Sequence, residues 1–292
     1  MTAPTAVRTG GREYLALLGL AALLGIPAAL VAIAFLALVH WSQDLLWTDL
    51  PDLLGADEPP AYLVVLLPAV GGLVVWVARR FLPGDGGSHP LHGLGPETVP
   101  WRHAPGIALA ALGTLVFGAV LGPEAPLIAL GAAVGSALNS MVHLTGRAQA
   151  VTATAGSFSA VSAVFGGPLV AGFLILEAGV GLGAKLIGLL LPGLVSAAVG
   201  YVLVIGVGTW GGLHTAGLEV PGLPQYEGHH VVDLLLALVV GVVAAVVIHG
   251  VRTLAGRVAE RVDRPGRMLG GLLAGGLAVG LLAELARLLG AG

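Results

Sequence analysis

Long apolar runs recur along this chain, and several are long enough to cross a lipid bilayer. They cover approximately residues 14–39, 61–81, 186–207, 231–251 and 268–289. A helix of about 20 apolar residues spans a hydrocarbon core of about 30 Å. The runs are continuous rather than alternating, which disfavours a transmembrane β-barrel. The pattern therefore predicts an all-α, multi-pass protein of the cell membrane.

Charged residues are too scarce to cover a water-facing exterior. They make up 10% of the 292 residues, where a soluble domain has about a quarter. The net charge of −3 and the apolar runs give no indication of a nucleic-acid partner. The chain has no cysteine, which excludes disulfides, thiol nucleophiles and cysteine-ligated clusters. We expect no cofactor and no enzymatic activity.

Basic residues predict how the chain is oriented in the membrane. Arginines lie in the amino-terminal segment, at Arg79 and Arg80, and between the last two apolar runs at 252–267. Because such residues concentrate on the cytoplasmic side, we expect these segments inside and residues 44–58 and 208–230 outside. The first apolar run is far longer than that of a signal peptide, so it is interpreted as a retained helix.

The middle of the chain is broken by proline and glycine. The sequences GPEAP at 122–126 and GGP at 166–168 interrupt apolar segments and are expected to leave pieces too short to cross alone. Unpaired backbone groups cost several kcal/mol in hydrocarbon, so such breaks occur where they are buried in protein or line a wet cavity. A helix that starts near Glu124 would point its positive end at the break and attract an anion. The glycine-rich turn at 84–90 could supply a second helix N-terminus that faces the first.

Glu124 is the most informative residue of this region. An ionisable group within the apolar stretch 107–142 costs at least ~2.5 kcal/mol to insert, so it is a functional candidate. Its carboxylate could occupy the anion's position and swing away when protonated, acting as both gate and proton carrier. The alternative is a glutamate that merely caps the helix. We favour the gate because Pro123 and Pro126 flank the residue and no basic partner lies near it in the sequence.

Two stretches resemble the CLC family of chloride channels and chloride/proton antiporters. Residues 122–135 resemble the family's G-(K/R)-E-G-P motif and the helix after it, and 158–177 resemble a second family stretch. The resemblance implies a single membrane domain of broken and re-entrant helices. A cytoplasmic segment at 1–12 would precede a first repeat at 13–207, an outer loop at 208–230, and the start of an inverted second repeat at 231–292, apparently truncated.

The resemblance also assigns site residues. Glu124 corresponds to the external gating glutamate, and the turn at 84–90 to a segment whose serine binds the central anion. That ligand is Ser88 or, if the proline is aligned instead, the backbone of Gly87. Ala178 stands where antiporters of the family carry an inner proton-transferring glutamate, which puts coupled exchange in doubt. The remaining residues expected around the anion are Gly122, Pro123, Ala125 and Pro126.

Other departures from the family pattern lie in the motif at 122–126 and in the sequence after Met268. Pro123 replaces the usual basic residue, and Ala125 replaces a glycine. No counterpart of the family's later G-x-F-x-P segment or its tyrosine follows Met268, so the resemblance covers about six-tenths of a family member. Either the chain is a fragment or its site is completed differently. Glu177 is interpreted as a structural or interfacial carboxylate near Lys185.

The sequence thus favours transport of an inorganic anion, with chloride as the default. A fluoride/proton antiporter of the same family is the alternative, and proton coupling remains open. A remote alternative is an intramembrane serine hydrolase that uses Ser157 or Ser159 with His249. A non-transporting membrane scaffold is a further one. The family resemblance implies a homodimer that pairs through residues 167–207.

Several remaining polar residues are interpreted as structural. Glu284 and Arg287 are three residues apart and are expected to pair on the last helix. No metal site is expected, because no carboxylate or cysteine completes a ligand set with the paired loop histidines. Those histidines are His89, His92, His229 and His230.

Overall fold

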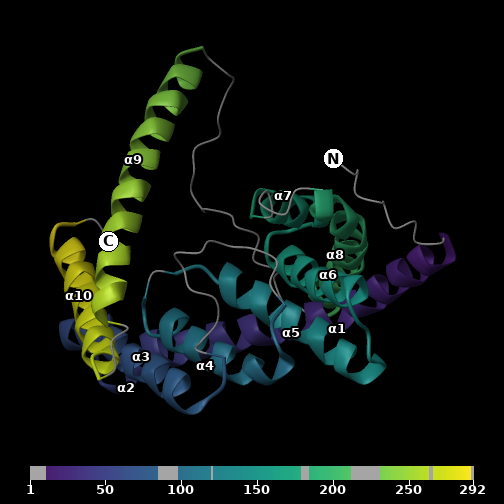
Figure 1. Cartoon of the computed structure of the whole chain (residues 1–292). Helices are drawn as coiled ribbons and strands as arrows, with labels where there is room; N and C mark the ends of the chain where they lie inside the picture. The colour runs from purple at the N-terminus through teal and green to yellow at the C-terminus, as the bar shows by residue number, and fades with distance from the viewer. Residues whose placement is uncertain are drawn as a thin grey trace.

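The computed structural model describes residues 11–84, 98–119, 121–178, 184–211, 231–262 and 266–290. Within these ranges every regular element is helical (Figure 1), which confirms the predicted all-α class. The elements, in chain order, are α1 (Gly11–Asp44), η1 (Leu45–Asp49), α2 (Leu50–Leu53), α3 (Ala61–Phe81), η3 (Trp101–His103), α4 (Ala104–Leu115), α5 (Glu124–Val142), α6 (Arg147–Val164), α7 (Pro168–Ala178), α8 (Ala184–Gly211), α9 (Val231–Val262) and α10 (Met268–Leu288).

Six of the described helical segments are long and apolar enough to cross a membrane. They are Gly11–Leu53, Ala61–Phe81, Glu124–Val142, Gly188–Gly206, Val231–Val262 and Met268–Leu288. Five of them coincide with the apolar runs of the sequence. The sixth is α5, which we expected to be too short. Pro126 does not shorten this helix, because it is the third residue of α5, where its missing N–H has no helical acceptor to lose.

Two helices continue beyond the expected ends of their spans. After α1, part of the stretch 44–58 that was expected outside the membrane forms the π-helical η1 and the short α2. Pro51 falls in the first turn of α2, where proline is tolerated. Helix α9 runs to Val262, so Arg252, Arg257 and Arg261 lie on its last turns rather than in a loop. No proline interrupts this segment before Pro265.

Helix α6 lies at the centre of a group of five helices. It packs against α1, α5, α7 and α8. Twelve consecutive residues, 151–162, are all buried, and most of them are alanine, glycine, serine or threonine. At Gly131 of α5 and Gly156 of α6 the two backbones touch, so that a Cβ atom at either position would overlap the other's carbonyl oxygen. Small residues thus allow close helix packing, as the glycine content led us to expect.

The hydroxyl groups of α6 link it to three neighbouring helices. Three serine hydroxyls each donate a hydrogen bond to a backbone carbonyl oxygen on a different helix, so these polar side chains in the core have partners on adjacent elements. The pairs are Ser157 to Ile128 of α5 at 2.9 Å, Ser159 to Gly25 of α1 at 2.7 Å, and Ser162 to Ala197 of α8 at 3.2 Å.

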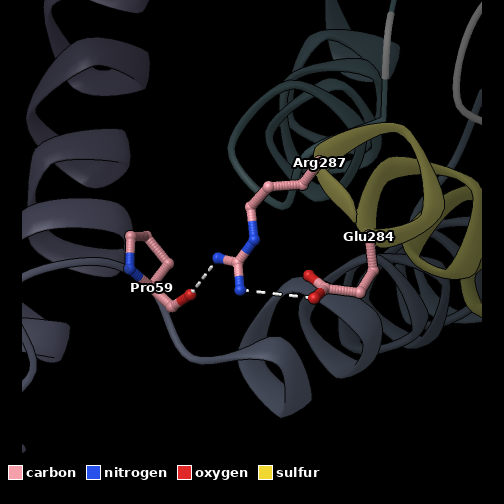
Figure 2. A network of polar contacts seen from close by, with 3 residues as sticks. All are labelled: Pro59, Glu284 and Arg287. Atoms are coloured by element: carbon pink, nitrogen blue, oxygen red, sulfur yellow. Dashed lines mark hydrogen bonds and ion pairs between the residues drawn. The ribbon is translucent and has the colours of Figure 1, made fainter. Parts of the chain in front are cut away.

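Helix α10 packs along α3. A Cβ atom at Gly276 or Gly280 would collide with the backbone of α3, so these glycines allow the helices to approach closely. At one end of the pair, Arg287 donates to the carbonyl oxygen of Pro59 at 2.8 Å and forms an ion pair with Glu284 at 3.2 Å (Figure 2). The expected pairing of Glu284 with Arg287 is confirmed. The bond to Pro59 places the end of α10 beside the start of α3.

Helix α9 lies apart from the other described helices. Among them it contacts α10 and no other element, and none of its residues is buried (Figure 1). Its first two-thirds are almost entirely apolar. In the membrane this surface has to face lipid or other protein, because its exposure to water would be strongly unfavourable.

Candidate functional site

The first predicted break lies between α4 and α5. Helix α4 ends at Leu115, and α5 begins at Glu124. Between them the described backbone turns twice, with the Ala119 N–H bonded to the Thr114 carbonyl at 3.1 Å and the Leu121 N–H bonded to the Ala119 carbonyl at 2.9 Å. The interruption and the helix start at Glu124 are confirmed.

Two side chains from the end of the first span hold the end of α4 in place. Gln43 donates to the Leu115 carbonyl at 2.9 Å, and the Trp47 indole N–H donates to the Val116 carbonyl at 2.8 Å. These carbonyls lie at the end of α4, where helical partners run out. The Trp47 ring also packs against Gly118, which has a positive φ of 87° and leaves room for the ring. Neither Gln43 nor Trp47 was predicted from the sequence to lie at this site.

The first turn of α5 offers two backbone donors to the break. Pro123 and Pro126 have no N–H, and the Leu127 N–H already donates to the Pro123 carbonyl at 3.0 Å. The N–H groups of Glu124 and Ala125 therefore remain without a helical carbonyl one turn earlier. Of the residues expected around the anion, the two prolines can shape the site, but they cannot donate an N–H to it.

The Glu124 side chain lies at the boundary between the break and the core. The residue is half-buried, Leu121 and Gly122 before it are exposed, and residues 127–133 after it are buried. Its carboxyl group folds back onto Gly122, where all three atoms closest to a Cβ atom built on the glycine belong to that carboxyl group. The carboxylate thus lies on the amino-terminal side of α5, where the positive end of the helix dipole attracts negative charge.

The second predicted break is also present. Helix α6 ends at Val164 and α7 begins at Pro168, with Gly166 at a φ of 74° between them. Glu177 is exposed near the end of α7.

The other predicted site residues are not tested. Ser88 and Gly87 lie outside the described residues. Ala178 is the last residue of α7, and its side chain and that of Lys185 also lie outside the described set.

The residues of the hydrolase hypothesis are not brought together. Ser157 and Ser159 are completely buried, and their hydroxyls donate to the carbonyls of Ile128 and Gly25. His249 lies on α9, which contacts α10 and no other described element. The two serines therefore have a packing role, and this hypothesis is wrong for the described structure.

The described residues contain no group of three or more His, Asp or Glu side chains that could hold a metal ion. The histidines weighed as a metal site, His89, His92, His229 and His230, lie outside those residues. For these four histidines, the absence of a metal site stays a prediction from the sequence.

Comparisons with known proteins agree with the fold. A solved structure titled as a slow cyanobacterial Cl−/H+ antiporter superimposes with a TM-score of 0.71 at 17% identity, over 91% of this chain and 63% of that one. Curated relatives include the putative ion-transport protein YfeO of Salmonella newport strain SL254 and of Salmonella typhimurium strain LT2. Each is 29% identical over 160 residues, which is 54% of this chain and 38% of the relative. The chain thus spans less than two-thirds of these proteins.

The family model described as voltage gated chloride channel matches residues 70–292. The match covers more than half of the chain and includes both helix breaks and the residues around Glu124. The helical fold and the six candidate spans are consistent with it. On this evidence, the chain belongs to the voltage gated chloride channel family.

Proposed function

We propose that this chain moves a small inorganic anion, chloride by default, through a cell membrane, and that Glu124 gates the path. The observation that carries the proposal is the position of the Glu124 carboxylate. It lies at the amino-terminal end of α5, directly after a break in an apolar segment, and folds back over Gly122. Family membership supports anion transport as the general activity.

The first turn of α5 has the properties of an anion site without a full positive charge. The N–H groups of Glu124 and Ala125 lack helical acceptors, and the helix dipole adds a partial positive charge there. An anion bound at this point would be held weakly enough to leave again. A Glu124 carboxylate competes for the same donors, whereas its protonated form has no negative charge to be attracted. Anion passage should therefore increase when Glu124 is protonated.

Proton coupling is a separate part of the proposal. The structural neighbour is titled a Cl−/H+ antiporter, and Glu124 could bind and release a proton on one side. Ala178 occupies the position of the inner proton carrier in the family pattern and has no ionisable group. We therefore propose anion passage whose rate depends on pH, with little or no stoichiometric proton exchange.

The test is anion flux through the full chain reconstituted in liposomes, at an acidic and a neutral pH. We expect Glu124→Gln to resemble the protonated state, so that the ratio of fluxes at the two pH values falls to about one. Glu124→Ala should abolish the pH dependence as well. Glu13, an exposed glutamate in the first turn of α1, provides the matched control, and Glu13→Gln should keep the wild-type pH response.

An unchanged pH response in both Glu124 variants would remove this residue from the mechanism. Absence of anion flux from the wild-type chain would contradict the transport proposal itself. The same vesicles, loaded with chloride, nitrate or fluoride in turn, distinguish the two substrate hypotheses. Flux of fluoride but not of chloride would contradict the chloride hypothesis and favour a fluoride/proton antiporter.

Orientation and assembly complete the proposal. We place the amino terminus in the cytoplasm, because the basic ends of α3 and α9 would then lie on the same side as the amino terminus. We also propose a homodimer that pairs through α7 and α8, where Leu169, Phe173 and Val202 are about 70% exposed. Cross-linking of single-cysteine variants on α7 tests the pairing without interference, since the chain has no native cysteine.

A further inference from the structure

The contact between Glu124 and Gly122 differs from the glycine contacts through which two helices of this chain pack together. At Gly25, Gly131 and Gly276, the nearest atoms to an added Cβ belong to the backbone of another helix. At Gly122 the three nearest atoms are Oε2, Cδ and Oε1 of Glu124. The missing side chain of Gly122 thus makes room for an ionisable group rather than for helix packing.

Backbone conformation does not explain the glycine. The φ of Gly122 lies outside the positive range that disfavours L-residues, so alanine can adopt this backbone without strain. The residue is also exposed, so an added methyl group displaces no packed core. A single methyl group at this position has one main consequence, which is a collision with the Glu124 carboxyl group.

The direction of that collision determines its effect. The carboxylate lies against Gly122 on the amino-terminal side of α5, at the positive end of the helix dipole. A methyl group on residue 122 occupies the volume that the carboxylate now fills, so the side chain has to rotate away from the helix end. Glu124 would then lose the attraction of the helix N-terminus that lets it compete with an anion.

We propose that Gly122 is a positioning residue that seats the carboxylate of Glu124 at the amino-terminal end of α5, and that its lack of a side chain sets how strongly this gate closes. The inference rests on the proposed function, because it assumes that Glu124 competes with the transported anion. Gly122 itself binds neither the proton nor, through a side chain, the anion.

The test is a double-mutant cycle in reconstituted liposomes. Gly122→Ala should raise the ratio of anion flux at neutral pH to anion flux at acidic pH about two- to fivefold, which corresponds to the usual strength of a charge at a helix N-terminus. A methyl group that only narrows the anion's path lowers both fluxes alike and leaves this ratio unchanged. In a Glu124→Ala background, which has no carboxylate to displace, Gly122→Ala should leave the ratio of the two fluxes unchanged.

Two controls separate this inference from a general effect of alanine and from the proposed function. Gly19→Ala on α1 adds a methyl group where nothing lies within 4 Å, so it should leave both fluxes unchanged. If Glu124→Ala abolishes the pH dependence but Gly122→Ala has no effect, the positioning role is refuted and the gate remains. If Gly122→Ala acts equally in both backgrounds, it acts through the fold and the inference is overturned. If Glu124→Ala has no effect, the proposed function itself fails.

Discussion

The hydrogen bond from Trp47 to the Val116 carbonyl provides a direct test of how the break before Glu124 is held. Trp47→Phe keeps an aromatic ring against Gly118 but removes the indole N–H, whose nitrogen lies 2.8 Å from the carbonyl oxygen. The carbonyl then loses a partner at the end of α4, while the packing is largely retained. The substitution therefore isolates the contribution of one polar contact.

The expected cost follows from the environment of this bond. Interhelical hydrogen bonds in membrane proteins contribute about 0.6 kcal/mol on average and up to about 1.7 kcal/mol. Trp47 is partly buried and its bond is short, so we expect about 1 kcal/mol. On the usual scale for chains of this size, that lowers the melting temperature by about 2–4 °C. Thermal unfolding in detergent, followed by circular dichroism, measures this shift.

A local measurement makes the test specific to the break. The Ala119 N–H donates to the Thr114 carbonyl within the same turn, so its hydrogen exchange should become faster in Trp47→Phe. Trp41 on α1 is 64% exposed, and Trp41→Phe is the matched control. A melting temperature equal to that of the control, together with unchanged exchange at Ala119, would show that Trp47 does not hold the break.

Two further predictions concern the packing of α6. Ser159→Ala removes the hydrogen bond to the Gly25 carbonyl, and we expect a loss of about 1 kcal/mol in unfolding free energy, measured by the same thermal assay. Gly156→Ala should be more damaging, by about 1–3 kcal/mol, because its methyl group would overlap the carbonyl of Gly131 and push α5 from α6. Gly275→Ala has open space around it and should cost nothing; equal losses at the two glycines would contradict the packing argument.

Much of the fold could be predicted because membrane helices follow simple local rules. Continuous apolar runs located five of the six candidate spans, and proline with glycine located both breaks. The start of α5 at Glu124 followed from the same signals. The length of α5 was predicted wrongly because the break at 122–126 was expected to leave only short helical pieces beside it. Position within the helix decides the effect of proline, and the first turn tolerates it.

Features that depend on contacts between distant segments could not be predicted in this way. Gln43 and Trp47 lie 72 and 69 residues before their acceptors, and nothing in the local sequence links them to the end of α4. The serines of α6 were recognisable from the sequence as residues that need hydrogen-bond partners, because hydroxyl groups in an apolar region do not stay unpaired. The sequence was compatible with nucleophilic serines and with serines that form interhelical hydrogen bonds. The carbonyl oxygens on α1 and α5 lie within hydrogen-bond distance, which supports the second interpretation.

The burial of α6 has a consequence for how the chain enters the membrane. This helix is the most enclosed described element, yet it is rich in alanine, serine, threonine and glycine, and its sequence does not qualify as a membrane span by apolar character. Residues of this kind gain little by leaving water for lipid, so α6 is a poor candidate for independent insertion. Three of its serine hydroxyls donate to carbonyl oxygens on α1, α5 and α8. Because α8 is synthesised after α6, stable integration of the innermost helix has to await a segment that leaves the ribosome later.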